Sequence, residues 1–203
     1  AQGAADCKGA RAGFRGPSSS GAVVVRRGGA RYSSPAMGDA ATIERPLQER
    51  LAALGIDSRT YRHPPVNTVE ESKALRGQLP GGHIKNLFLR DKKRNMWLVT
   101  VPEDRAVDLK ALRHVLGAKG TLSFGSAELL AEALGVAPGA VTPFAVMNDR
   151  EGSVTMALDR AVLANDPVNA HPLHNQATTA LSPGDLLRFL SACNHPPLML
   201  DFD

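Results

Sequence analysis

The strand-like segment from Ile84 to Arg90 holds the side chain best suited to chemistry. Side chains of a strand alternate between two faces, so Lys85 shares its face with Leu87 and Leu89. A lysine at the mouth of an apolar face either lays its stem over the core with its ammonium in water or directs the cation into a cavity. In a cavity it would meet a negative substrate group or a developing oxyanion. The sequence leaves both interpretations open.

A second candidate segment is His171-Pro172-Leu173-His174-Asn175. Two histidines three residues apart suggest a metal site, but on an extended chain they point to opposite faces, and no third ligand of suitable spacing is near. A histidine before proline is held extended, which can fix its ring at a pocket wall. The alternative is a hydrogen-bonded loop histidine.

The third candidate is the loop from Gly135 to Phe144, which contains two glycines and two prolines. It precedes a predicted strand from Pro143 to Met147. A stiff loop of this kind can bring backbone amides close to a small ligand, although loops of the same composition also serve only as turns. The nucleophile elbow, the P-loop, the HExxH helix and the GxGxxG turn are all missing from the sequence, which disfavours the standard nucleophile-based hydrolases.

Composition separates a leader from the rest of the chain. Residues 1–36 are rich in Gly, Ser, Ala and Arg and hold six of the 24 basic side chains but one of the 20 acidic ones. The remaining residues carry 18 basic and 19 acidic side chains. We interpret residues 1–36 as a disordered leader, with a mitochondrial transit peptide as the alternative. The protein is otherwise expected in the cytoplasm.

Two further features narrow the class of protein. No apolar run reaches the roughly 20 residues of a membrane-spanning helix, so we expect no membrane partner. Cys7 and Cys193 lie near opposite ends of the chain, which argues for a reducing compartment and against a disulfide framework.

Periodic structure begins at Ile43. The patterns predict helices near residues 43–54, 68–75, 108–116 and 126–134, and a last helix after Ser182-Pro183. They predict strands at residues 60–63, 84–90, 96–101, 143–147 and 154–158, an extended stretch at 170–181 and an edge strand at 198–202. We therefore expect a single α/β (α+β) domain over residues 43–203, with a mixed, largely antiparallel sheet flanked by helices.

Several segments occur in a specific order. They are residues 83–93, Trp97-Leu98-Val99, Thr142-Pro143-Phe144, and His171 to Asn175 followed by Ala177-Thr178-Thr179. In this order they resemble the YbaK and prolyl-tRNA-synthetase-associated family, whose editing domains occur inserted in some prolyl-tRNA synthetases and also free-standing. The resemblance covers Ile43 to Asp203, and His174 is the departure from the family pattern that we notice.

The resemblance implies a mixed sheet with flanking helices and hydrolysis of an aminoacyl ester at the 3′ end of tRNA, without a metal or other cofactor. Lys85 matches the characteristic lysine of the family, and we expect it to be catalytic together with Asn86. The implied pocket is lined by two segments: Gly139, Thr142, Pro143 and Phe144 from the first, and His171, Pro172 and Asn175 from the second.

The resemblance implies alanine misattached to proline tRNA as the best-fitting substrate, and a pocket sized for alanine would exclude proline sterically. The expected partner is therefore tRNA, and an aminoacyl-tRNA synthetase is a further candidate. The alternative is a domain of the same fold that binds tRNA or a synthetase without hydrolysis.

A local basic cluster could hold tRNA on an otherwise nearly neutral domain. Arg90, Lys92, Lys93 and Arg94 lie at the loop that follows the strand of Lys85. The loop would contact the backbone of the acceptor end and position it without reading base sequence. The alternative is a solvated turn.

Overall fold

The computed structural model describes residues 39–64 and 79–202. The helices are α1 (Ala40–Ala53), α3 (Leu109–Val115), α4 (Ala127–Leu134) and α5 (Pro183–Ala192), with 3-10 helices η1 (Pro143–Asn148) and η2 (Arg160–Ala164). The strands are β1 (Ser58–Arg62), β2 (Gly82–Arg90), β3 (Met96–Pro102), β4 (Ser123–Phe124), β5 (Val154–Asp159), β6 (Val168–Ala170), β7 (Ala177–Leu181) and β8 (Leu198–Leu200). None of the described helices is long and apolar enough to cross a membrane.

The strands form one eight-stranded mixed sheet in the order β1-β7-β6-β2-β3-β5-β8, with β4 paired to β2 off this path. The pairs β1–β7, β6–β7, β2–β3 and β2–β4 are antiparallel. The pairs β2–β6, β3–β5 and β5–β8 are parallel. The predicted mixed α/β fold, with a sheet that has both antiparallel and parallel pairs, is confirmed.

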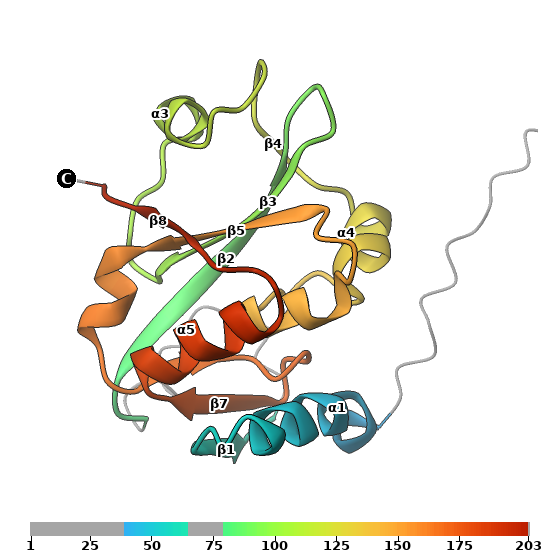
Figure 1. Cartoon of the computed structure of the whole chain (residues 1–203), viewed down its shortest axis with the longest axis vertical. Coiled ribbons are helices and arrows are strands. Elements are labelled where there is room, and N and C mark those ends of the chain that lie inside the picture. Colours follow the sequence, from blue (N-terminus) through green and yellow to red (C-terminus); the bar gives the residue numbers. More distant parts are fainter. Residues whose placement is uncertain (1–38, 65–78, 203) are drawn as a thin grey trace, which may run out of the picture. The chain divides into compact units, whose positions relative to one another are not determined.

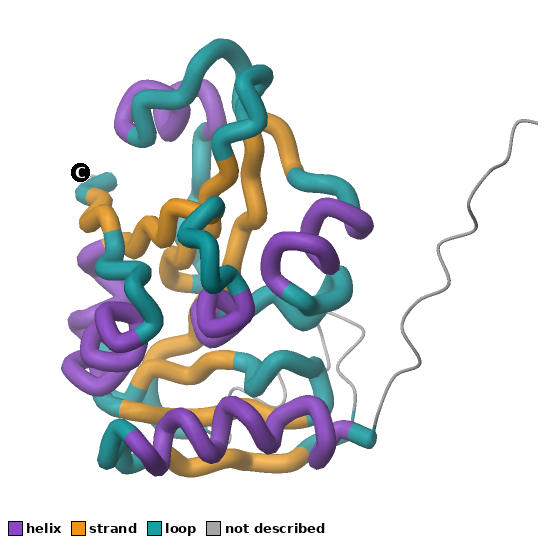
Figure 2. Tube along the Cα trace, turned by 45° about the vertical axis from the view of Figure 1, so that its right-hand side comes forward, coloured by secondary structure: helices purple, strands orange, loops and turns teal. Residues whose placement is uncertain are grey.

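The two faces of the sheet are covered differently. On one face, apolar side chains of α1, α4, η1 and α5 pack with the strands into the larger core cluster. On the other face, α3 and the segment after it cover β2, β3 and β5. Figure 1 shows α3 beside the hairpin end of β2 and β3, away from α1 and α5. Figure 2 shows α1 running alongside β1 and β7.

Local capping residues fix the ends of α4 and α5, and the cap by Ser182 was predicted. Ser126 and Ser182 cap α4 and α5, each accepting a hydrogen bond from a backbone N–H three residues on. Gly135 ends α4 with φ of 65°, a left-handed conformation that favours glycine. These local choices place α4 and α5 where their apolar stripes meet the sheet.

One predicted element is wrong, and others were missed. The segment predicted as a strand at 143–147 is the 3-10 helix η1, because Thr142 caps it and Pro143 opens its first turn. The extended stretch 170–181 is broken between β6 and β7, and neither β4 nor η2 was predicted. The leader and the helix predicted at 68–75 lie outside the described residues.

Candidate active site

Lys85 lies in the middle of β2, half-buried and directly opposite Val101 of β3. Alternation along β2 puts it on the face of Leu87 and Leu89, as predicted. In the described part of the chain, no carboxylate or other acceptor forms an ion pair or hydrogen bond with its ammonium.

Strand pairing brings side chains from three other strands onto the same face. His83 of β2 is paired with Asn169, Asn169 with Ala180, and Ala180 with Arg59. Residues paired directly across a sheet share a face, and so do residues two apart on one strand.

Two positions further along these strands lie Lys85, Thr178 and Tyr61, and Thr178 is paired directly with Tyr61. Three interstrand spacings of about 4.8 Å separate β2 from β1, so Lys85 and Tyr61 are about 14 Å apart at the backbone. This is the span of a small ligand. Tyr61 and Thr178 were missed in the sequence because their proximity to Lys85 depends on the strand order.

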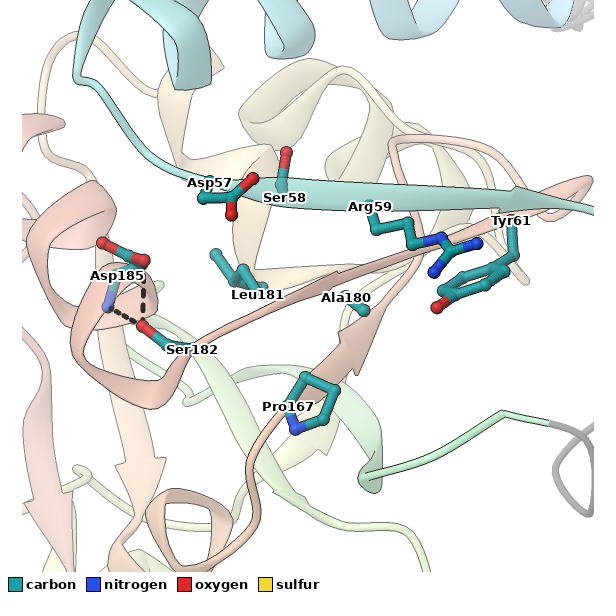
Figure 3. Close-up of a pocket in the computed structure, with 9 residues that line it drawn as sticks. All are labelled: Asp57, Ser58, Arg59, Tyr61, Pro167, Ala180, Leu181, Ser182 and Asp185. Atoms are coloured by element: carbon teal, nitrogen blue, oxygen red, sulfur yellow. Dashed lines mark hydrogen bonds between the residues drawn. The ribbon is translucent and has the colours of Figure 1, made fainter.

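A pocket of about 320 Å³ opens at the β1 end of this face, between β1, β7 and the start of α5. Figure 3 shows Arg59 and Tyr61 projecting from the same side of β1, near Ala180 and Pro167. The Arg59 guanidinium lies over the Tyr61 ring, 5.0 Å from its centroid. The signal in the sequence was a cation and an aromatic residue two apart on a short strand.

Asn169 adds an unusual polar atom to the Lys85 face. Its side chain is buried, and its Nδ2 donates to the carbonyl of Pro80 over 2.8 Å. That bond fixes the orientation of the amide and leaves Oδ1 buried without a hydrogen-bond partner among the described residues. Buried polar atoms are nearly always satisfied, so an acceptor of this kind calls for a donor from a ligand or a water molecule.

His171 follows β6 directly and is half-buried. Its Nδ1 donates to the carbonyl of Ala177 over 3.2 Å. Burial lowers the pKa of His171, the hydrogen bond to Ala177 opposes this effect, and the nearby His63 and His174 lower the pKa further. The ring is thus held neutral at physiological pH, with Nε2 as its basic nitrogen.

The loop that carries His171 is bound to α1 through His174 and Glu44. His174 is buried, and its Nε2 donates to Glu44 of α1 over 3.0 Å, while its Nδ1 accepts from the backbone N–H of Gln176. Glu44 also forms an ion pair with Arg62. His174, the departure from the family pattern, is therefore a structural anchor of the loop.

The remaining predicted residues of that loop divide by burial. Pro172 is buried, and Asn175 is half-buried. Nothing in the structure assigns a contact to a substrate to either residue, and their predicted binding role stays a prediction.

Asn86 points away from Lys85, to the face of the larger core. Its Nδ2 donates to the carbonyl of Val141 over 2.9 Å, and its Oδ1 accepts from Thr100 Oγ1 over 2.7 Å. Both polar groups of the amide are thus occupied. The geometry gives Asn86 the role of tying the loop before η1 to β2, and a direct catalytic role for it stays a prediction.

The predicted pocket loop lies on this same side of the sheet. Thr142, Pro143 and Phe144 are buried, and Phe144 packs edge-on against Phe189 with ring centroids 5.2 Å apart. Gly139 is exposed, with φ of 86°. The three buried side chains are enclosed by the core in this structure, so a substrate contact of this loop would have to come from Gly139 or from backbone groups.

The basic cluster also splits. Alternation along β2 puts Arg90 on the face opposite to Lys85. Lys92, Lys93 and Arg94 are exposed on the turn between β2 and β3. The exposed side chains of the turn can therefore contact tRNA bound on the Lys85 face, whereas Arg90 lies on the other face of the sheet. The predicted tRNA contact stays a prediction for all four residues.

Comparison with known proteins places this geometry in a family. The model of the aminoacyl-tRNA editing domain matches residues 63–189. Prolyl-tRNA synthetase associated domain-containing protein 1 of Mus musculus is 43% identical over 161 residues, which is 77% of this chain and 95% of that protein. The chain belongs to the aminoacyl-tRNA editing domain family.

A bacterial member and two solved structures extend the likeness. The prolyl-tRNA editing protein ProX of Acetoanaerobium sticklandii is 37% identical over 144 residues, or 70% of this chain and 87% of that protein. The crystal structure of hypothetical protein APE2540 has a TM-score of 0.62 at 22% identity and covers 76% of this chain and 97% of its own.

A second structure, described as a candidate trans-editing enzyme for prolyl tRNA synthetase, has the same TM-score and identity and covers 78% of this chain and 95% of its own. These two likenesses establish the editing-domain fold, and the family includes aminoacyl-tRNA deacylases. In the described residues of this member, no group of three or more His, Cys, Asp or Glu side chains is arranged to hold a metal ion.

Proposed function

We propose that this protein is a free-standing hydrolase that removes a mischarged amino acid from tRNA, with alanine on proline tRNA as the best-fitting substrate. The observation that carries the proposal is the half-buried Lys85, whose ammonium has no partner among the described residues and lies on a sheet face shared with Tyr61 and Thr178. A preorganised cation of this kind stabilises a phosphate or a developing oxyanion.

In the proposed reaction the oxygen of a water molecule bonds to the ester carbonyl carbon, and the bond from that carbon to the terminal ribose oxygen breaks. The attacking water loses two protons: one ends on the ribose oxygen, the other passes to solvent, and the amino acid leaves as a free carboxylate. Lys85 balances the negative charge as it develops on the carbonyl oxygen. The adjacent ribose hydroxyl of the substrate assists the water.

Asn169 supplies a second contact in this proposal. An aminoacyl ester carries a free α-ammonium group, which is a strong donor. The buried Oδ1 of Asn169 has no donor within residues 39–64 and 79–202 and lies on the Lys85 face, about 8 Å from Lys85 at the backbone. An ammonium held there would place the ester carbonyl toward Lys85.

Selection by size supports alanine over proline. A synthetase site built for proline cannot strongly reject the smaller alanine, whereas a pocket that fits alanine excludes the ring of proline. The family relation to a protein named for prolyl-tRNA editing supports proline tRNA as the tRNA of the substrate.

The test is a deacylation assay on alanine-charged proline tRNA, with proline-charged proline tRNA as the control. We expect rapid release of alanine and retention of proline. Binding of both tRNAs without hydrolysis of either would instead support the second candidate, a binding module of the same fold. Hydrolysis that a chelator abolishes would point to a metal-dependent enzyme and contradict the proposal.

A further inference from the structure

Phe124 of β4 is an exposed aromatic side chain on a domain with few aromatic residues. It is 62% exposed, one of three exposed large apolar side chains in the described residues, and the others, Val115 and Leu198, are aliphatic. The family site as described above does not use it. Its position relative to Lys85 suggests what it contacts.

Strand pairing places Phe124 on the Lys85 side of the sheet. Phe124 is paired directly with Leu89, which shares its face with Lys85. The strands β6 and β4 pair with the same edge of β2, at residues 82–83 and 89–90, so the part of β2 that holds Lys85 lies between them. Four residues along β2 and one strand across, Phe124 lies about 14 Å from Lys85 at the backbone.

Two basic loops meet beside Phe124. Lys92, Lys93 and Arg94 lie on the turn after β2, and Lys119 lies on the segment that leads into β4. The side chain of Lys92 lies against Gly120, four residues before Phe124. All four cations are exposed, and none forms an ion pair with a carboxylate in residues 39–64 and 79–202.

Asp91 holds the two loops in a fixed arrangement. Its buried carboxylate accepts hydrogen bonds from the backbone N–H groups of Lys93, Asn95 and Lys119 and from the side chain of Asn95. Burial alone would raise the pKa of Asp91, but these hydrogen bonds bring it below its usual value. The carboxylate of Asp91 is thus turned inward, and the cations are exposed.

We propose that Phe124, with Lys92 and Lys119 beside it, forms a binding site for the unpaired 3′ end of tRNA, one base stacking on the ring and the flanking phosphates meeting the two lysines. This inference rests on the proposed function. Exposed aromatic side chains within a basic surface bind single strands in this way, without selecting a base. At about 3.4 Å per stacked nucleotide, the distance to Lys85 corresponds to roughly four nucleotides, or fewer of a stretched strand.

The chemistry favours RNA over a protein partner. Four cations without an ion-pair partner among the described residues lie on the two loops next to β4, and Phe124 is the one exposed aromatic side chain among the exposed large apolar residues of that part of the chain. A stable protein contact requires a larger apolar centre depleted of charge. An extended polyanion with unstacked bases fits both features.

The test uses an uncharged RNA hairpin that copies the acceptor stem, with and without its unpaired 3′ end. Phe124→Ala should weaken binding of the tailed hairpin about tenfold and leave binding of the blunt hairpin unchanged. Phe124→Trp should retain wild-type affinity, whereas Phe124→Leu should behave like the alanine variant. Leu198→Ala, an exposed apolar residue at the other edge of the sheet, is the matched control and should change nothing.

The salt dependence separates stacking from charge. Phe124→Ala should keep the wild-type salt slope, whereas Lys92→Ala and Lys119→Ala should each reduce it by about 0.7. Wild-type binding of the tailed hairpin by Phe124→Ala, or equal loss for tailed and blunt hairpins, would overturn the inference.

Because the RNA is uncharged, these results do not depend on catalysis. A wild-type protein that binds the tail through Phe124 but releases no alanine would refute the hydrolase and keep the site. If the wild-type protein releases alanine and Phe124→Ala does so with the same KM, the result would refute the binding site and support the hydrolase.

Discussion

Lys85 and Asn86 are neighbours on β2, yet they belong to two faces of the sheet with opposite polar character. On the Asn86 face, polar side chains are buried and bonded to one another, as in the chain from Thr100 through Asn86 to the carbonyl of Val141. On the Lys85 face, the ammonium of Lys85 and the Oδ1 of Asn169 lack partners among the described residues.

We therefore expect the adjacent residues Lys85 and Asn86 to have two different roles: Lys85 binds a ligand, and Asn86 stabilises the fold. Satisfied buried groups contribute to folding stability, whereas unsatisfied groups cost stability and are retained where a ligand completes them. Substitutions on the Lys85 face should therefore lower activity, and substitutions on the Asn86 face should lower the free energy of unfolding.

The largest expected effect is on the Lys85 face. Lys85→Ala should lower the rate of deacylation by about 100-fold or more, the scale of losing one preorganised electrostatic group. Folding should be nearly unchanged, because Lys85 has no ion-pair partner among the described residues that its removal would strand. Single-turnover deacylation, with melting curves alongside, checks both statements. Near-wild-type turnover would remove Lys85 from the mechanism.

The corresponding substitution on the other face should reverse this pattern. Asn86→Ala leaves the buried hydroxyl of Thr100 and the carbonyl of Val141 without partners, which should lower the free energy of unfolding by about 1–3 kcal/mol. Chemical denaturation measures that loss. Activity per folded molecule should fall much less than in Lys85→Ala, and Thr100→Val should give a similar loss of stability. A stable but inactive Asn86→Ala would restore the predicted catalytic role of Asn86.

Features of the fold and the site that depend on residues close together in the sequence could be predicted, whereas features that depend on distant residues could not. Local signals sufficed for β2, β3 and the Ser-capped helices α4 and α5, because alternation and caps act over a few residues. The face of Lys85 was predicted for the same reason. The turn at Thr142-Pro143 was misjudged because an apolar run after proline fits a strand as well as a 3-10 helix.

The neighbours of Lys85 required the tertiary fold. Tyr61 and Asn169 join it only through the order β1-β7-β6-β2, which no local pattern encodes. His174 appeared to be a neutral departure from the family, and its partner Glu44 lies 130 residues away. Phe124 had no signal in the sequence beyond its residue type. Its position opposite Leu89 depends on the pairing of β4 with β2, which was not predicted.

A smaller effect is expected from Asn169 on the Lys85 face. Asn169→Ala removes the acceptor for the α-ammonium group, so KM for alanine-charged tRNA should rise about tenfold, the scale of one hydrogen bond to a charged group. Binding of uncharged tRNA should not change, because it carries no ammonium at that point. Parallel steady-state kinetics and binding assays separate these quantities. Equal weakening for charged and uncharged tRNA would show that the variant disturbs the loop at Pro80 instead.

The smallest effect concerns His171 and the pH dependence of stability. Because burial and the nearby histidines hold the pKa of His171 below its ordinary value, the unfolded chain binds a proton at His171 more readily than the folded one. Neutral His171 therefore contributes stability that is fully present above the unfolded pKa of about 6.5 and is lost as the pH falls through the lower folded pKa.

His171→Gln cannot titrate, so it isolates this contribution. As the pH is lowered from 7.5 toward 5, the free energy of unfolding of the wild type should fall more steeply than that of the variant. The difference in free energy of unfolding between the two proteins should therefore decrease or change sign. Urea denaturation at a series of pH values measures both slopes. His63→Gln serves as a second variant: it removes one of the charges that depress the pKa of His171, so part of the steepness should disappear with it. Parallel slopes for the wild type and His171→Gln would show that His171 titrates alike in the folded and unfolded chains, and would contradict a folded-state pKa below the ordinary value.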